Sequence, residues 1–401
     1  MIQETLSEYA ENKGWSGRGT LTQMVDELER QRKSKLDFVA DTRDLKIGLR
    51  LDKRGDRHTY IPVLQPATPE ARAFLPADGL PILEQAVEQI GEKTEPPMGV
   101  RFSKTLWEQR PHRFAQLVDG LWQDGPQRRF IRCLDGQVRA MLSSSYRVLD
   151  HHDIAFAALD AVRSKNGEVF EASLSERRMR IKFSSREVWD AVDGIRRGDS
   201  GRWFAGGLGN QEYLGKVGAK SWGDLPGGPG SVHPLVTVGN SETGDGGYFV
   251  RIGILLGACF NIATVEEVVG RVHLGSKMDV GIYSEQTLQQ EAKAVYMQAR
   301  DAVVAAFDPA KWKLIVAKVR KAQSEKIEAP TEAVENVVQN AGLSDTSKQA
   351  LLEYFLRDYN QTRFGLAQAV ARLAQDERGA DQASELEAVA GRVLKGALVE
   401  A

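Results

Sequence analysis

Two long apolar runs separated by a glycine-rich turn constrain the fold of this chain more than any other feature. The first run ends at Asn240, the second begins at Tyr248, and residues 244–247 between them read Gly-Asp-Gly-Gly. Apolar, β-branched runs on either side of such a turn are typical of a β-hairpin. The second run, residues 248–262, is apolar on nearly every position, which indicates a strand buried on both faces. We therefore expect this hairpin to form the central sheet of the main domain.

Two further hairpins are predicted upstream, with helices packed against them. In the first, strands at residues 129–134 and 137–142 flank Asp135 and Gly136, a dipeptide that type I′ turns prefer because both central residues need a positive φ. Apolar spacing predicts the elements that follow: strands at residues 169–174 and 179–183, and helices at residues 150–163 and from Ser185 onward. This succession is typical of an α+β fold with an antiparallel sheet.

Length and apolar periodicity divide the chain into three predicted parts. At 401 residues it exceeds one typical core. Residues 1–90 are expected to form an N-terminal arm or small subdomain, and residues 91–283 an α+β core domain with a glycine-rich loop at 200–231. Helical spacing of apolar residues predicts a helical C-terminal region at residues 284–401. The predicted fold class is therefore α+β: an antiparallel sheet built from β-hairpins with packed helices, followed by helices.

Composition narrows the possible functions. The net charge of −2 offers no general attraction to nucleic acid or membranes, so any such affinity has to come from a local patch. The longest apolar run is too short to span a bilayer, and the first residues lack the apolar segment of a signal peptide. We therefore expect a cytoplasmic protein without a membrane partner. Cys133 and Cys259 are too few for a disulfide framework or a zinc site.

No catalytic motif is complete in this sequence. Residues 209–218 resemble a phosphate-binding loop, but five residues separate the glycines where the motif needs four, and Val217 replaces the Ser or Thr that holds magnesium. Another group could converge as metal ligands but has no recognised ligand spacing: His233, Glu242, Asp245 and His273. We therefore predict no catalytic residue, no bound metal and no cofactor.

Basic residues gather on the two upstream hairpins. Residues 101–202 contain 19 Lys and Arg against 14 Asp and Glu. Side chains alternate along a strand, so Arg178, Arg180 and Lys182 share one face while the apolar residues between them point to the core. The sequence therefore predicts a basic face on the strand of the second upstream hairpin.

This basic face suits a single-stranded nucleic acid, because arginine bonds two phosphate oxygens at once and an exposed ring can stack on a base. The two-residue turn of the first hairpin would add Arg132 and Arg139, opposite each other, to the same surface. The residues predicted to contact nucleic acid are Arg128, Arg132, Arg139, Arg147, Arg177, Arg178, Arg180, Lys182 and Trp203. The alternative is that these cations form cross-strand ion pairs on an ordinary solvated sheet.

Several motifs occur together in the order of a known family. They are Val-Arg-Ala-Met-Leu-Ser and Tyr-Arg-Val-Leu-Asp within residues 138–150, Asn-Ser-Glu-Thr-Gly at 240–244, Cys259 in its apolar run, His-Leu-Gly at 273–275, and Thr-Arg-Phe-Gly-Leu-Ala-Gln-Ala-Val at 362–370. In this order they resemble the phage- and plasmid-borne family catalogued as domain of unknown function 932. The chain departs from the family after the cysteine, where Phe-Asn-Ile replaces a polar residue followed by Asn-Gly. The resemblance implies a mobile-element protein and assigns no catalytic residue.

We therefore expect a non-enzymatic nucleic-acid-binding protein of a phage or plasmid that binds single-stranded DNA in recombination or replication. Ring-forming single-strand annealing proteins look similar in outline, and this analogy implies a homo-oligomer. One alternative is a protein–protein interaction module, such as an inhibitor of host defence, in which the arginines are ordinary surface. A third is a metal-dependent hydrolase or nuclease that uses Glu242, Asp245 and His273.

Overall fold

The computed structural model describes residues 17–19, 21–52, 59–146, 148–185, 188–191, 231–256, 262–271, 285–377 and 379–399. Within them the chain has the predicted α+β class, with antiparallel sheets, packed helices and a helical C-terminal region. The buried apolar residues form two large cores, and we call the parts around them the main lobe and the second lobe. Among the described helices, none is long and apolar enough to cross a bilayer.

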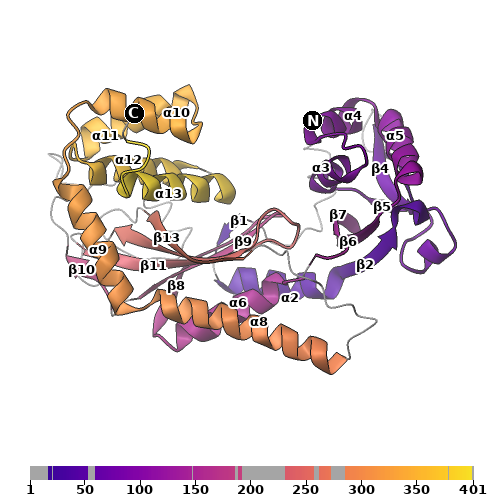
Figure 1. Cartoon of the computed structure of the whole chain (residues 1–401), viewed down its shortest axis with the longest axis horizontal. Helices are drawn as coiled ribbons and strands as arrows, with labels where there is room; N and C mark the ends of the chain where they lie inside the picture. Colours follow the sequence, from indigo (N-terminus) through magenta and orange to yellow (C-terminus); the bar gives the residue numbers. More distant parts are fainter. Residues whose placement is uncertain are drawn as a thin grey trace.

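A seven-stranded antiparallel sheet forms the centre of the main lobe (Figure 1). Its strands lie in the order β1 (Gly17–Gly19), β8 (Gly167–Leu174), β9 (Met179–Ser185), β11 (Ser231–Asn240), β12 (Tyr248–Leu256) and β13 (Ile262–Arg271), and the short β10 (Asp190–Ala191) also pairs with β11. The two predicted hairpins of this sheet, β8–β9 and β11–β12, are confirmed. Since β12 lies between β11 and β13, it is the buried strand that its apolar sequence predicts.

Helices cover both faces of this sheet (Figure 1). One face carries α2 (Leu21–Ser34), α6 (His151–Arg163) and α8 (Glu285–Ala306), and the other carries α12 (Arg363–Asp376) and α13 (Ala380–Leu394). The remaining C-terminal helices are α9 (Pro309–Ser324), α10 (Pro330–Ala341) and α11 (Asp345–Asp358). Helix α13 packs so closely on β13 that a Cβ atom at Gly391 would clash with the carbonyl oxygen of Thr264. The sheet is therefore tightly covered on the side of α13.

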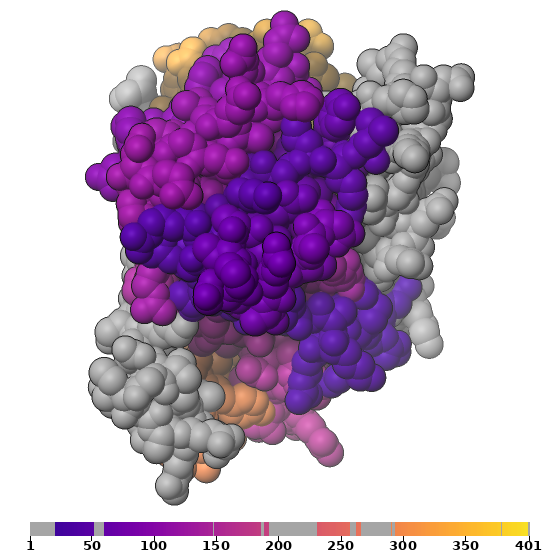
Figure 2. All heavy atoms as spheres, turned by 90° about the vertical axis from the view of Figure 1, so that its right-hand side faces the viewer, coloured from indigo at the N-terminus to yellow at the C-terminus, as the bar shows by residue number. Residues whose placement is uncertain are grey.

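The second lobe gathers segments that the sequence separates. Strands β2 (Lys35–Asp41), β6 (Arg128–Leu134) and β7 (Gln137–Ser143) form one sheet, and β3 (Leu45–Asp52), β4 (Thr59–Pro66) and β5 (Leu80–Pro81) form another. Around them lie α3 (Glu84–Lys93), α4 (Val100–Gln109), α5 (Pro111–Asp124) and the short 3-10 helices η2 (Thr42–Asp44) and η3 (Glu70–Ala73). Figure 2 shows the indigo and purple segments of this lobe interlocked. Residue 90, where we predicted a domain boundary, lies within α3, and Ile90 is buried in this lobe's core.

The hairpin of β6 and β7 has the predicted turn but a different register. Asp135 and Gly136 have φ values of 53° and 70°, as a type I′ turn requires. A β-bulge beside the turn then shifts the pairing, so Arg132 lies opposite Ala140. The prediction that Arg132 and Arg139 face each other across the hairpin is therefore wrong.

The predicted helix from Ser185 onward is also wrong where the structure describes it. Ser185 is the last residue of β9, and Asp190 and Ala191 pair with Val232 and Ser231 of β11. The apolar spacing that suggested a helix is misleading because the Trp189 side chain is 43% exposed rather than packed in the core. Pairing with the free end of β11 satisfies the backbone here instead of helical hydrogen bonds.

Candidate functional site

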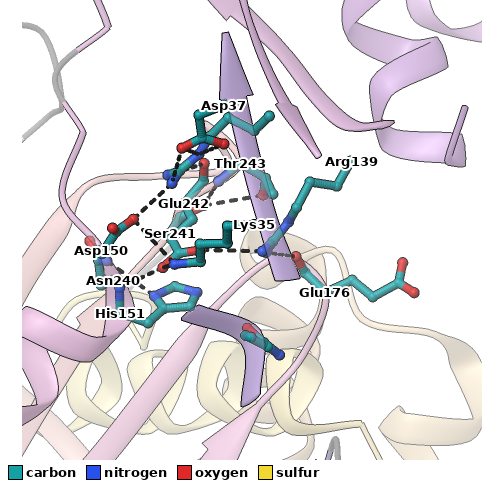
Figure 3. A network of polar contacts seen from close by, with 12 residues as sticks. Lys35, Asp37, Arg139, Asp150, His151, Glu176, Asn240, Ser241, Glu242 and Thr243 are labelled. Carbon is teal, nitrogen blue, oxygen red and sulfur yellow. Dashed lines mark hydrogen bonds and ion pairs between the residues drawn. The ribbon is translucent and has the colours of Figure 1, made fainter. Parts of the chain in front are cut away.

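The turn between β11 and β12 lies buried where the main lobe meets the second lobe (Figure 3). Its first residues are polar, yet Asn240, Ser241, Glu242 and Thr243 are all buried. Buried polar groups are stable only when hydrogen-bonded, and a buried charge needs opposite charges around it. The groups around Glu242 must therefore supply the hydrogen bonds and opposite charges that stabilise it in this buried turn.

Glu242 receives hydrogen bonds from four different parts of the chain (Figure 3). Its Oε1 atom accepts from Lys35 Nζ at 2.7 Å and from the backbone N–H of His151 at 2.6 Å. Its Oε2 atom accepts from Arg139 Nη1 at 3.2 Å, and its carbonyl oxygen accepts from Arg132 Nη1 at 3.2 Å. Because His151 begins α6, the helix dipole also favours the negative charge.

Two further carboxylates balance the cations around Glu242. Arg132 Nη2 donates to Asp37 Oδ2 at 2.7 Å and to Asp150 Oδ1 at 2.7 Å, and Lys35 Nζ lies 3.2 Å from the same Asp150 oxygen. The side chains of Lys35, Arg132 and Arg139 thus face those of Glu242, Asp37 and Asp150. We call these six residues the buried ion network after its buried members Glu242, Arg132 and Arg139, because Asp37 and Asp150 lie at its partly exposed edge. Its positive and negative charges are equal in number, so it leaves no excess positive charge for a phosphate.

The pKa values in this network follow from burial and charge. Burial by itself raises the pKa of the Glu242 carboxyl, but the charges of Lys35, Arg139 and Arg132 hold it well below its usual value. Burial also raises the pKa of the Asp37 carboxyl, although Arg132 opposes that rise. Burial lowers the pKa of Arg132, but the three carboxylates outweigh it and raise the pKa above its usual range. Glu242 and Arg132 are therefore held as ions, whereas burial makes Asp37 easier to protonate.

His151 is the titratable group of this site that stays neutral. Asn240 Nδ2 donates to the carbonyl oxygen of Leu149 at 2.9 Å and lies 3.1 Å from His151 Nδ1, which must therefore accept. A proton on Nδ1 would point at another donor. Burial, helped by the nearby charges of Arg139 and Lys35, outweighs the opposing charge of Glu242 and lowers the pKa of His151 to about 3.

This lowered pKa predicts a loss of stability in acid. The unfolded chain takes up the histidine proton at its ordinary pKa of 6.5, whereas the folded chain resists it down to about 3. The stabilisation is complete above pH 6.5, and we expect the unfolding free energy to fall by about 1.4 kcal/mol per pH unit for this proton as the pH drops below that value. His151→Gln should flatten this slope between pH 6.5 and 4.5 in urea titrations. Equal slopes for the variant and the wild type would contradict the assignment.

Neutral hydrogen bonds tie the same turn to the second lobe. Gln85 Nε2 donates to Thr243 Oγ1 at 2.9 Å, and Gln89 Nε2 donates to the Thr243 carbonyl oxygen at 2.5 Å. The Tyr146 hydroxyl donates to the carbonyl oxygen of Ser241 at 3.1 Å. The turn is therefore a joint that fixes the main sheet to α3 and β7. The only sequence signal for it is the Asn-Ser-Glu-Thr-Gly motif, because the partners lie far away along the chain.

The predicted nucleic-acid residues do not form one exposed surface. Arg132 and Arg139 belong to the buried ion network. Arg180 and Lys182 lie beneath α13 and are only 4% and 3% exposed. Arg128 is exposed, at the start of β6. Arg177 contacts Glu88 and Asp245, and Arg178 donates to the Asp245 carbonyl oxygen. Arg147 and Trp203 lie outside the described residues.

Acidic residues of α13 occupy the strand face that we predicted to be basic and exposed. Arg180 Nη1 donates to Asp381 Oδ1 at 2.5 Å, and Lys182 Nζ donates to Glu387 Oε1 at 2.6 Å and to Glu171 Oε2 at 3.0 Å. The predicted alternation along β9 is correct, since Ile181 and the apolar residues beside it lie in the main core. The predicted exposure of Arg180 and Lys182 is wrong because α13 covers them. The Lys182–Glu171 contact is the cross-strand ion pair of the alternative interpretation.

The four residues considered as possible metal ligands are not all brought together where the structure describes them. His233 lies near the start of β11, at the far end of that strand from Glu242, and its Nε2 atom contacts Ser231 Oγ at 2.8 Å. His273 lies outside the described residues, and within the described ranges no three metal-binding side chains gather. Cys259 is also outside them, and burial raises the pKa of the Cys133 thiol to about 12, which makes it a poor nucleophile.

Comparison with protein-family models, with curated proteins and with solved structures finds no match for this chain. The resemblance drawn from the sequence motifs therefore stays a prediction.

Proposed function

We propose that this protein binds nucleic acid without catalysing a reaction, and that helix α9 makes the contact. The proposal keeps the class of function expected from the sequence and moves the contact away from the hairpin arginines. One observation carries it: α9 contains five Lys and Arg residues and no Asp or Glu, in a chain whose net charge is −2. A local concentration of positive charge is what binding to phosphates requires.

The packing of α9 separates its apolar side from its charged side. Trp312, Ile315, Val316, Val319 and Ala322 are buried against the main core. The opposite side faces solvent and consists of Lys313, Leu314, Ala317, Lys318, Arg320 and Lys321, which we call the cationic face of α9. In Figure 1, this helix runs along the outer end of the main sheet, on the side away from the second lobe.

Exposed anions lie beside two of the cations on the cationic face. Arg320 Nη2 contacts Asp190 Oδ1 at 2.6 Å, and Lys321 Nζ lies 3.7 Å from Glu325 Oε1. Glu325 also binds Arg363 at 2.8 Å, so its charge is shared between two cations. Exposed ion pairs of this kind contribute little free energy, and a phosphate can compete for the same cations at small cost.

A salt titration tests the proposal. Fluorescence anisotropy of a labelled oligonucleotide should give an affinity that falls steeply with salt, because each neutralised phosphate releases counterions. Replacing Lys313 and Lys321 together with Gln should flatten the log–log slope by roughly one to two units.

The matched control removes the same charge from the second lobe. Arg101→Gln with Arg113→Gln changes two exposed arginines on α4 and α5 and should leave the slope unchanged. The proposal fails if the wild type does not bind at low salt, or if both double variants act alike. Equal competition by poly-glutamate would also overturn it, because the surface would then serve acidic proteins as well as nucleic acid.

A further inference from the structure

We infer that the surface formed by α9 and Trp189 prefers single-stranded to duplex nucleic acid, with a base stacked on the Trp189 indole; this rests on the function proposed above. Trp189 is a large aromatic residue whose ring is exposed rather than packed in a core. Trp189 is 43% exposed, although a tryptophan at the surface of a folded chain usually has a contact to make.

The residue after Trp189 contacts the cationic face of α9. The next residue, Asp190, accepts a hydrogen bond from Arg320 Nη2 of that face at 2.6 Å. Asp190 also pairs with Val232 in the sheet, and the preceding residue, Val188, packs against the main core. The backbone on both sides of Trp189 is therefore anchored, and Trp189 immediately precedes the residue that contacts a cation of α9.

This juxtaposition of ring and cations discriminates between the two forms of nucleic acid. In a single strand the base faces are accessible, so a base can stack on the indole while neighbouring phosphates contact Arg320 and the lysines. In a duplex the bases are already stacked on one another, and only phosphate contacts are left. Leu314, 66% exposed on the same face of α9, offers a further apolar contact to a base or sugar.

Another exposed aromatic residue provides the comparison. Phe102 is 52% exposed and follows Arg101 on α4, in the second lobe. Helix α4 also carries Glu108, so its charge is mixed where that of α9 is purely positive. If any exposed ring beside an arginine were sufficient, Phe102 would serve as well as Trp189.

The test measures affinity for an oligothymidine and for a duplex of equal length at one salt concentration. Trp189→Ala should weaken single-strand binding by roughly 5- to 140-fold, with little change for the duplex. Trp189→Phe should restore part of the loss, and Phe102→Ala should change neither affinity. Quenching of tryptophan fluorescence on binding the single strand should shrink in Trp189→Phe.

The outcomes separate this inference from the proposed function. If Trp189→Ala lowers both affinities equally, or neither, the single-strand inference is overturned while the salt dependence of α9 stands. A wild type that binds the duplex as tightly as the single strand would overturn the inference in the same way. If the wild type binds neither probe, the proposed function fails and the inference fails with it.

Discussion

Replacing Glu242 with alanine should lower the unfolding free energy by about 3–5 kcal/mol, because removing one partner of a buried ion network leaves the others uncompensated. Lys35 and Arg139 would both lose the carboxylate that lies 2.7 Å and 3.2 Å from them. The backbone N–H of His151 would lose its acceptor as well. Urea unfolding of the variant and the wild type at neutral pH measures the difference.

Glu108→Ala is the matched control for this experiment. Glu108 is exposed on α4, and removing such a carboxylate should change the unfolding free energy by no more than about 0.5 kcal/mol. A Glu242→Ala midpoint equal to the wild-type midpoint would mean that water reaches Lys35 and Arg139. The network would then not be the joint between the lobes that its contacts indicate.

Replacing Lys182 with methionine should be similarly costly, at about 3–5 kcal/mol. Lys182 lies between Glu171 and Glu387, whose side chains are both nearly inaccessible to water, and without the ammonium group the two carboxylates repel each other. The pKa of a carboxyl group rises in such a position. A folded-state pKa above the unfolded value costs stability at high pH, so the deficit of the variant should shrink as the pH falls.

A compensated variant distinguishes lost charge balance from lost packing. Combining Lys182→Met with Glu171→Gln and Glu387→Gln removes every charge of this group and should recover a large part of the stability, since buried ionic groups are often replaceable as a set. Lys165→Met, at an exposed position after α6, controls for the loss of a lysine. If the triple variant is no more stable than Lys182→Met, charge balance is not what the lysine supplies.

Local patterns in the sequence predicted much of the fold. Turn chemistry identified the hairpin at Asp135 and Gly136, whose positive φ values only a few residues adopt without strain. Alternation along residues 179–183 correctly separated the core face of β9 from its charged face. The α+β class and the helical C-terminal region follow from apolar spacing in the same way. These features depend on residues close together along the chain, so the sequence alone can predict them.

The tertiary structure decided which charged faces are exposed. The residues near Lys182 in the sequence do not predict its contact with Glu387, because Glu387 lies 205 positions away, on α13. Likewise, the sequence around Glu242 is typical of an exposed turn, but in the structure α6 and the second lobe cover this residue. For α9, the sequence by itself contains the concentration of positive charge. Packing against the main core decided that four of its cations face solvent, and the tertiary fold brought Asp190, the residue after Trp189, into contact with one of them. Burial depends on contacts between distant segments, and a local pattern of charge carries no information about them.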